Sequence, residues 1–292
     1  MLLHGIKSGL IRWFPVDSAH ILFLIYPAVG IILATLFVKY IVRDNISEGV
    51  TRVLYAMSRR NSRIARHNCW TSIVGGATTI GFGGSVGPEA PIVLTGAAIG
   101  SNIGRLARLN YKHTTLLLCC GAGAALAAIF KAPITGVVFV LEILMLDITA
   151  GSVIPLLIAS ITATTMAFML RGFDPILAVT LAPADAFELW QIPLFILLGV
   201  LCGLMAWYFT SMNSRVGGFF KSIDKQYKKW LWGGAILGIL IFVFPPLYGE
   251  GYEGFTSLMH GNAQELFNNS LFYRFRDIDW VIILFVIATM FF

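Results

Sequence analysis

The chain has 292 residues, of which 57% are hydrophobic and only 12% are charged, and its mean hydropathy is +0.80. This composition excludes a soluble globular domain and indicates an all-α polytopic membrane protein, because apolar runs of about 20 residues recur along the chain. The net charge of +6 is carried largely by short loops between these runs, so it indicates membrane topology and no nucleic-acid partner.

Apolar segments and charged connections alternate along the chain. A first span is expected at residues 19–40, after an amphipathic segment at 2–14 that has no signal-peptide cleavage site. Further apolar helices are expected at 70–84, 91–106, 114–130, 134–145, 153–170, 193–210, 230–244 and 280–292. Glycine or proline interrupts several of these segments, which is typical of transporters whose broken helices end at a central site.

The charges of the connections predict one orientation in the membrane. Basic connections at 43–67, 105–113 and 215–229 are expected on the cytoplasmic side, and acidic or mixed connections at 171–188 and 247–277 on the outside. We therefore expect a multi-pass protein of the cell membrane whose apolar faces contact the lipid bilayer. The cysteines and histidines show no metal-binding spacing, so no metal and no cofactor are expected.

The stretch at 78–100 is rich in glycine and proline, and it holds the only formal charge between Trp70 and Arg105, which is Glu89. An apolar helix is expected to begin near Pro91, just after this carboxylate. Three glycines recur at four-residue spacing on one face of that helix: Gly96, Gly100 and Gly104. Such a stripe predicts that a second helix packs closely against it.

Glu89 would lie at or just before this helix N-terminus, where unpaired amides and the helix dipole favour negative charge. The carboxylate could occupy the positive end of the helix, or swing away and leave that end to an anion. An ionisable group inside a membrane segment is by default a functional-site hypothesis. The alternative is a structural carboxylate that caps its own helix or bonds to a neighbour.

Two motifs resemble the CLC family of chloride channels and proton/chloride antiporters. Residues 87–91, Gly-Pro-Glu-Ala-Pro, are similar to the family signature Gly-(Lys/Arg)-Glu-Gly-Pro. Residues 121–142 are similar to its small-residue helix, its Phe-x-Ala-Pro break and its short helix that ends in glutamate. The resemblance implies an inverted-repeat fold with broken and short helices. Residues 1–190 would form the first repeat, and 191–292 the opening helices of a truncated second, in a fragment of a longer protein.

By this resemblance Glu89 is the gating glutamate, which competes with anions for the pore and carries protons in the antiporters. Gly87 and Ala90 would belong to the anion site beside it. The chain departs from the signature at two positions, because Pro88 replaces the basic residue and Ala90 replaces glycine.

The resemblance also implies an anion-binding position at the start of an earlier helix, near Gly49. The family has a serine there, which aligns with Glu48, or with Ser47 if the alignment shifts by one residue. An ionised Glu48 would repel anions unless it is protonated or turned towards the cytoplasm. As an alternative, Ser47 and Glu48 form an ordinary helix cap in a cytoplasmic loop.

Antiporters of the family carry paired glutamates at the end of the later short helix, and the second is the internal proton acceptor. Glu142 matches the first of the pair and Ile143 the second. An aliphatic side chain cannot relay a proton, which favours the channel branch. Glu142 is a candidate for the proton path, or else a structural carboxylate bonded to amides or to a loop arginine.

The sequence therefore predicts an anion channel or transporter, with chloride as the anion, in which helix N-termini form the pathway and Glu89 gates it. The resemblance implies a homodimer with one pore per subunit. Two alternatives stay open: a proton-coupled antiporter of the same family, or a non-conducting membrane scaffold or fragment. An enzyme is not expected, because the spans hold no Ser/His or His/Asp pair at helical spacing.

Overall fold

A computed structural model describes residues 19–43, 49–172, 191–267, 270, 272, 274 and 278–291, and all regular elements formed by these residues are helical. The α-helices are α2 (Ala19–Phe37), α3 (Gly49–Arg59), α4 (Asn68–Gly81), α5 (Glu89–Leu106), α6 (Tyr111–Phe130), α7 (Pro133–Ile143), α8 (Ala150–Arg171), α9 (Ile192–Ser222), α10 (Gln226–Val243), α11 (Tyr252–Met259) and α12 (Asp279–Phe291). A π-helical turn extends α2 over Val38–Val42, and 3-10 turns cover Pro245–Leu247 and Ala263–Phe267.

Within the described ranges, four helices are long and apolar enough to cross a membrane: Leu24–Val42, Tyr111–Phe130, Ala150–Arg171 and Ile192–Ser222. The shorter helices α3, α4 and α7 lie between them in the chain, and α3 falls within the basic connection predicted at 43–67. The protein is a multi-pass integral membrane protein with broken helices, as the sequence predicts.

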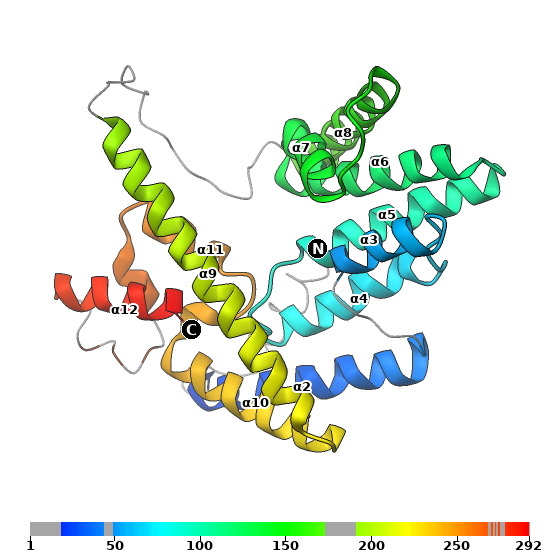
Figure 1. Ribbon diagram of the computed structural model, residues 1–292. Coiled ribbons are helices and arrows are strands. Elements are labelled where there is room, and N and C mark those ends of the chain that lie inside the picture. Colours follow the sequence, from blue (N-terminus) through cyan, green and yellow to red (C-terminus); the bar gives the residue numbers. More distant parts are fainter. Residues whose placement is uncertain are drawn as a thin grey trace.

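The α5–α6 pair is the centre of the molecule, with α3 and α4 packed on α5 and with α7 and α8 packed on α6 (Figure 1). The two helices approach so closely that a side chain at Gly96 would collide with the carbonyl of Gly121. One turn along, a side chain at Gly100 would collide with the backbone of Leu117. The predicted packing of a second helix against the glycine stripe is therefore confirmed.

Five helices contribute to one apolar core around this pair. The fully buried side chains include Val53 of α3, Leu94 of α5, Leu118 of α6, Val140 of α7 and Leu156 of α8. Burial of such side chains stabilises the bundle mainly through close packing, because lipid outside is as apolar as the core.

The break between α6 and α7 lies where the sequence places it. Lys131 has a φ of 53° and ends α6, and Pro133 begins α7, where its missing N–H costs no helical hydrogen bond. The short helix then folds back on α6, with the backbones of Gly123 and Gly136 in close approach. The break thus allows α7 to pack one face against α6 and α8.

On the other side of α4, α2 and α10 form a second closely packed pair (Figure 1). Here Gly234 and Gly238 of α10 lie against the backbone of α2 at Ala28 and Leu24. This contact joins the two predicted repeats, because α2 belongs to the first and α10 to the second.

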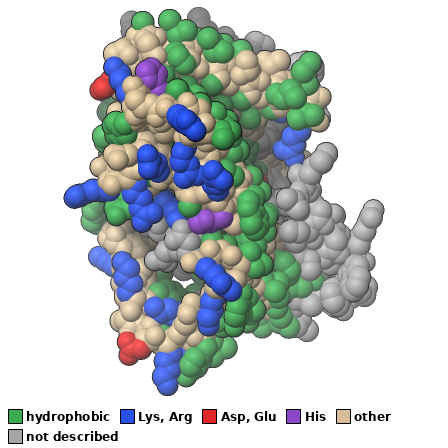
Figure 2. Space-filling model, turned by 90° about the vertical axis from the view of Figure 1, so that its right-hand side faces the viewer, with side chains coloured by type: hydrophobic (Ala, Val, Ile, Leu, Met, Phe, Trp, Pro, Cys, Tyr) green, Lys and Arg blue, Asp and Glu red, His purple; other side chains and the backbone are tan. Residues whose placement is uncertain are grey.

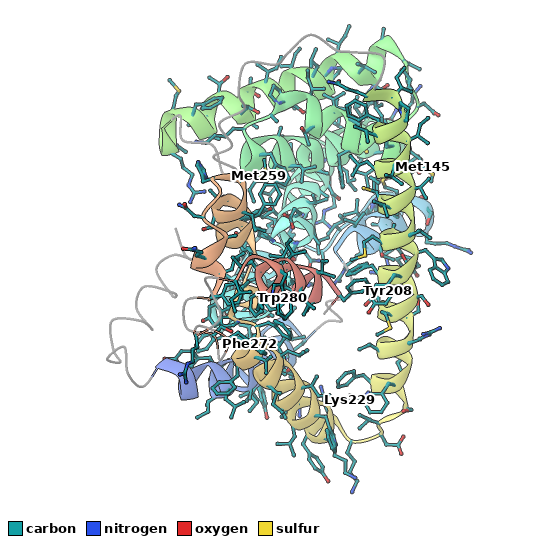
Figure 3. The ribbon with its side chains drawn as sticks, turned by 90° about the vertical axis from the view of Figure 1, so that its left-hand side faces the viewer. Met145, Tyr208, Lys229, Met259, Phe272 and Trp280 are labelled. Atoms are coloured by element: carbon teal, nitrogen blue, oxygen red, sulfur yellow. The ribbon has the colours of Figure 1, made fainter. Side chains whose placement is uncertain are left out.

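The helix α9 differs from its prediction. The sequence predicts a basic connection over 215–229, but α9 continues as helix to Ser222, and only 223–225 separate it from α10. Exposed arginine and lysine side chains are good helix formers, so they do not end the helix. None of the residues of α9 is buried, and the helix stands along one side of the molecule (Figure 3).

Candidate functional site

Glu89 is the first residue of α5, two residues before the predicted helix start. Pro88 occupies the N-cap position and supplies no side-chain cap, so the first amides of α5 are left for another partner. Pro91 is tolerated inside the first turn, because the N–H that it lacks would have no partner within the helix. The local sequence therefore places a carboxylate at an uncapped helix N-terminus.

The carboxylate of Glu89 lies back over Gly87. A side chain at Gly87 would overlap the Glu89 carboxylate, so only glycine leaves room for this conformation. Glu89 is half-buried, and its Oε1 accepts a hydrogen bond from the hydroxyl of Tyr252. The carboxylate is thus held beside the start of α5.

A second helix N-terminus meets the first one here. Gly49 begins α3, and its Cα lies so close to the carbonyl of Ala90 that a side chain could not fit between them. The N-termini of α3 and α5 therefore lie side by side, so the positive ends of the two helix dipoles are close together. Such an arrangement favours an anion.

The structure thus brings four of the predicted site residues together: Gly49, Gly87, Glu89 and Ala90. The remaining two candidates for anion binding, Ser47 and Glu48, lie outside the described residues. Their assignment stays a prediction.

Two tyrosines at this site were not found from the sequence. Tyr248 follows the turn Pro245–Leu247, and its hydroxyl donates to the carbonyl of Gly81 at the end of α4, at 3.0 Å. Tyr252 begins α11 and donates to Glu89. The sequence analysis assigned both to an external loop. The spacing of four residues between them, with glycines in between, is the signal that could have drawn attention to them.

Both tyrosines are hydroxyl donors over the physiological pH range. Burial, reinforced by Tyr26, raises the pKa of Tyr248 to about 12. Burial also raises the pKa of Tyr252, and the Glu89 carboxylate that accepts its hydrogen bond raises it further, with a smaller effect from Glu250. The ionised form of each phenol is therefore disfavoured at the site.

Glu142 lies in the last turn of α7 with an exposed side chain. Among the described residues it makes no hydrogen bond or ion pair that would mark it as a structural carboxylate. Ile143 beside it is also exposed, at 44% of its surface. No described contact joins Glu142 to Glu89, so its place on a proton path stays a prediction.

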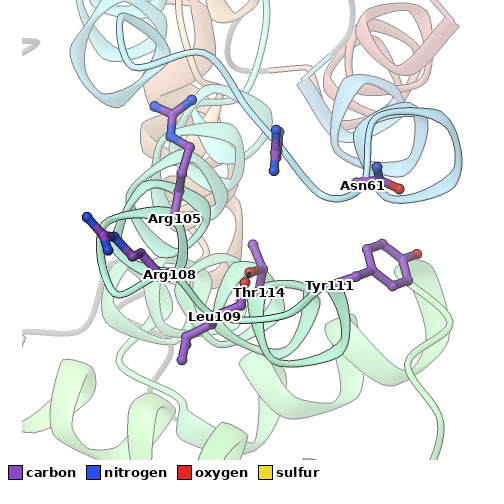
Figure 4. Close-up of a pocket in the computed structure, with 7 residues that line it drawn as sticks. Asn61, Arg105, Arg108, Leu109, Tyr111 and Thr114 are labelled. Carbon is purple, nitrogen blue, oxygen red and sulfur yellow. Dashed lines mark hydrogen bonds between the residues drawn. The ribbon is translucent and has the colours of Figure 1, made fainter.

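A basic cavity lies at the opposite end of α5, about 24 Å along the helix from Glu89 at 1.5 Å per residue. It has a volume of about 440 Å3 and is lined by Asn61, Arg63, Arg105, Arg108, Leu109, Tyr111 and Thr114 (Figure 4). Lysine and arginine side chains gather on one face of the molecule (Figure 2). This cavity is separate from the Glu89 site and lies on the predicted cytoplasmic side.

In the described part of the chain, no group of three His, Cys, Asp or Glu side chains could hold a metal.

Comparisons with known proteins agree on one family. A family model described as voltage gated chloride channel matches residues 30–292. The chain is 27% identical over 242 residues to a protein of Ralstonia nicotianae described as a putative chloride channel protein ClcB-like. This alignment covers 81% of this chain and 56% of that protein. It is 30% identical over 195 residues to the H+/Cl− exchange transporter ClcA of Vibrio cholerae, with 64% of this chain and 41% of that protein covered. The chain thus spans about half the length of these curated relatives.

Two solved structures have the same fold. A slow cyanobacterial Cl−/H+ antiporter matches with a TM-score of 0.72 and 24% identity, over 90% of this chain and 61% of that one. A CLC-type fluoride/proton antiporter matches with a TM-score of 0.68 and 23% identity, over 82% and 59%. These likenesses confirm the predicted all-α fold of broken and short helices. The division into repeats at residue 190 stays a prediction.

Proposed function

Because this chain belongs to the voltage-gated chloride channel family, we propose that it forms part of a proton-coupled anion exchanger with chloride as its anion and Glu89 as its gating carboxylate. The observation that carries the proposal is the Glu89 carboxylate at the start of α5, beside the N-terminus of α3. A transport role follows from a membrane bundle whose converging helix ends favour an anion.

The exchanger ranks above the channel, which reverses the order given by the sequence. The sequence favoured a channel because Ile143 stands where antiporters have a proton acceptor. The Vibrio cholerae relative is named as an H+/Cl− exchanger, and both solved structures are named as antiporters. One relative is named a putative chloride channel, so the channel remains the second candidate.

The anion pathway would use backbone amides at the starts of α3 and α5. Amide donors and the positive helix ends replace the hydration shell of an anion without adding a full positive charge, so the anion can both bind and leave. The neighbourhood of Gly49 and Ala90 would form part of this pathway, with Gly87 beside it. Ser47 and Glu48 are proposed to complete the cytoplasmic side.

Glu89 would gate this pathway by competition. An ionised carboxylate at the start of α5 occupies the region that favours negative charge, and it repels a second anion there. Protonation removes the charge and with it the attraction to the helix end, so the side chain can leave and an anion can enter. Anion entry and proton binding at one residue then become linked, which is the requirement for exchange.

Glu142 is proposed as the inner end of the proton path. Its exposed carboxylate can exchange protons with water, whereas Ile143 cannot. The route between Glu142 and Glu89 would then be completed by water or by other groups.

We further propose a homodimer with one pore per subunit. α7 and α8 expose apolar side chains on the surface of the bundle, including Ile134 at 71%, Ile154 at 57% and Met169 at 78%. Such a surface is covered either by lipid or by another subunit.

The test uses the full-length protein reconstituted in liposomes. A chloride gradient is imposed across the membrane, and the external pH is recorded under conditions in which any coupled proton movement would run against the proton gradient. An exchanger moves protons against their gradient, a channel conducts chloride without proton movement, and a scaffold produces neither flux. Protein-free liposomes are the control, and chloride flux without uphill proton movement would contradict the exchanger.

A further inference from the structure

The segment between α10 and α11 reaches Glu89 from a distant part of the chain, and it begins at an aromatic cluster. Phe244 ends α10, and its ring lies 5.2 Å from the ring of Phe285 in α12. Phe267 also packs on Phe285, with ring centroids 4.5 Å apart. Ser270 adds a hydrogen bond of 3.3 Å to the carbonyl of Val243. This cluster holds the end of α10 in place.

Tyr248 fastens the same segment to α4. Its hydroxyl donates to the carbonyl of Gly81, and its ring fills the space where a side chain at Gly83 would lie. Gly83 has a φ of 93°, which only glycine adopts readily, so the tight loop and the ring position depend on each other. The segment is therefore attached to the loop that leads into Glu89.

Two glycines then bring the chain back towards α5. Gly249 and Gly251 have φ values of 81° and 78°, in the left-handed region that favours glycine. They reverse the chain between the two tyrosines, and Tyr252 begins α11 with its hydroxyl on the Oε1 of Glu89. This hydrogen bond joins residues 163 positions apart.

We propose that Tyr252 is a positioning residue that holds the ionised carboxylate of Glu89 in the closed position. This proposal rests on the gating role proposed for Glu89. A phenol donates a stronger hydrogen bond to a carboxylate than to a neutral carboxylic acid. The bond therefore stabilises the ionised, occluding form and weakens when Glu89 takes up a proton.

The charges around this hydrogen bond favour the same donor role. Tyr252 is affected by Glu89 and by Glu250, and both carboxylates oppose ionisation of the phenol. Tyr248 and Tyr26 are the other titratable groups described near this segment, and burial keeps Tyr248 protonated. Glu48, which precedes Gly49 in the sequence, lies outside the described residues.

The experiment compares chloride flux against pH for the full-length protein in liposomes, with Glu89→Ala, Tyr252→Phe and the double variant. Tyr252→Phe removes the donor and keeps the ring, so the closed form is weakened. A hydrogen bond to a charged group contributes about 1.5 kcal/mol or more, which corresponds to an upward shift of about one pH unit in the flux midpoint. In the Glu89→Ala background, Tyr252→Phe is expected to have no further effect.

Tyr208→Phe is the matched control, because the Tyr208 hydroxyl donates to the carbonyl of Phe291 on the surface and not to Glu89. Glu89→Asp is a second variant that is expected to shift the flux midpoint upward. Its shorter side chain keeps the negative charge but does not reach the Tyr252 hydroxyl. The proposal is overturned if Tyr252→Phe keeps the wild-type midpoint, or if its shift persists in the Glu89→Ala background. An unchanged pH profile in Glu89→Ala overturns the gating role as well, so the two failures are distinguishable.

Discussion

Replacement of Gly121 by alanine tests the packing that supports the whole site. A Cβ at Gly121 would overlap the carbonyl of Gly96 and press on the amide nitrogen of Gly100, both of which are backbone atoms of α5. Backbone cannot rotate away as a side chain can, so α5 and α6 would have to separate. Overpacking of this kind costs about 1–3 kcal/mol, and we expect about 2 kcal/mol for Gly121→Ala.

The control is Gly199→Ala on α9, where no atom lies within 4 Å of the added methyl group. There the substitution is expected to stabilise the helix by about 0.5–1 kcal/mol, because alanine loses less backbone entropy than glycine. Thermal unfolding in detergent should place Gly121→Ala about 4–8 °C below the wild type, at about 2–4 °C per kcal/mol. If Gly121→Ala melts at or above Gly199→Ala, the close contact between α5 and α6 is wrong.

Three further predictions test other parts of the fold by thermal unfolding. Thr71→Val should raise the melting temperature, because the Thr71 hydroxyl is fully buried and has no hydrogen-bond partner among the described residues, which costs about 1 kcal/mol of stability. A lower melting temperature would show that the hydroxyl is satisfied. Tyr248→Phe should lower the free energy of unfolding by about 1 kcal/mol, because it removes the hydrogen bond to the Gly81 carbonyl. An unchanged melting temperature would contradict that contact. Leu118→Ala should lower the free energy of unfolding by about 2–5 kcal/mol, because Leu118 is fully buried. Leu204→Ala on the exposed helix α9 should lower it much less, and equal losses for the two variants would contradict the assigned core.

Sequence reasoning located the features that depend on neighbouring residues. The glycine stripe at Gly96 and Gly100 and the break at Lys131 follow from local spacing and from the backbone limits of proline. Glu89 stood out because a single charge in a long apolar stretch is rare. The resemblance also named Gly49 and Ala90 as candidates for the anion site, and the structure brings these two residues into contact.

Features that depend on distant parts of the chain were missed. Tyr252 meets Glu89 across 163 residues, and no periodicity in either stretch encodes that contact. Tyr248 was assigned to an external loop, because the connection at 247–277 is polar and of mixed charge. The end of α9 was also misplaced, since charged side chains signal a membrane boundary without ending a helix.

The most direct measurement is chloride flux as a function of pH for Glu89→Gln in the full-length protein, alongside the wild type. Glutamine keeps the shape of a protonated glutamate but carries no charge and takes up no proton. The account predicts that wild-type flux depends on pH, whereas Glu89→Gln conducts chloride at a nearly constant rate across the series and moves no protons. Wild-type flux with the wild-type pH response in Glu89→Gln would contradict the gating role of this carboxylate.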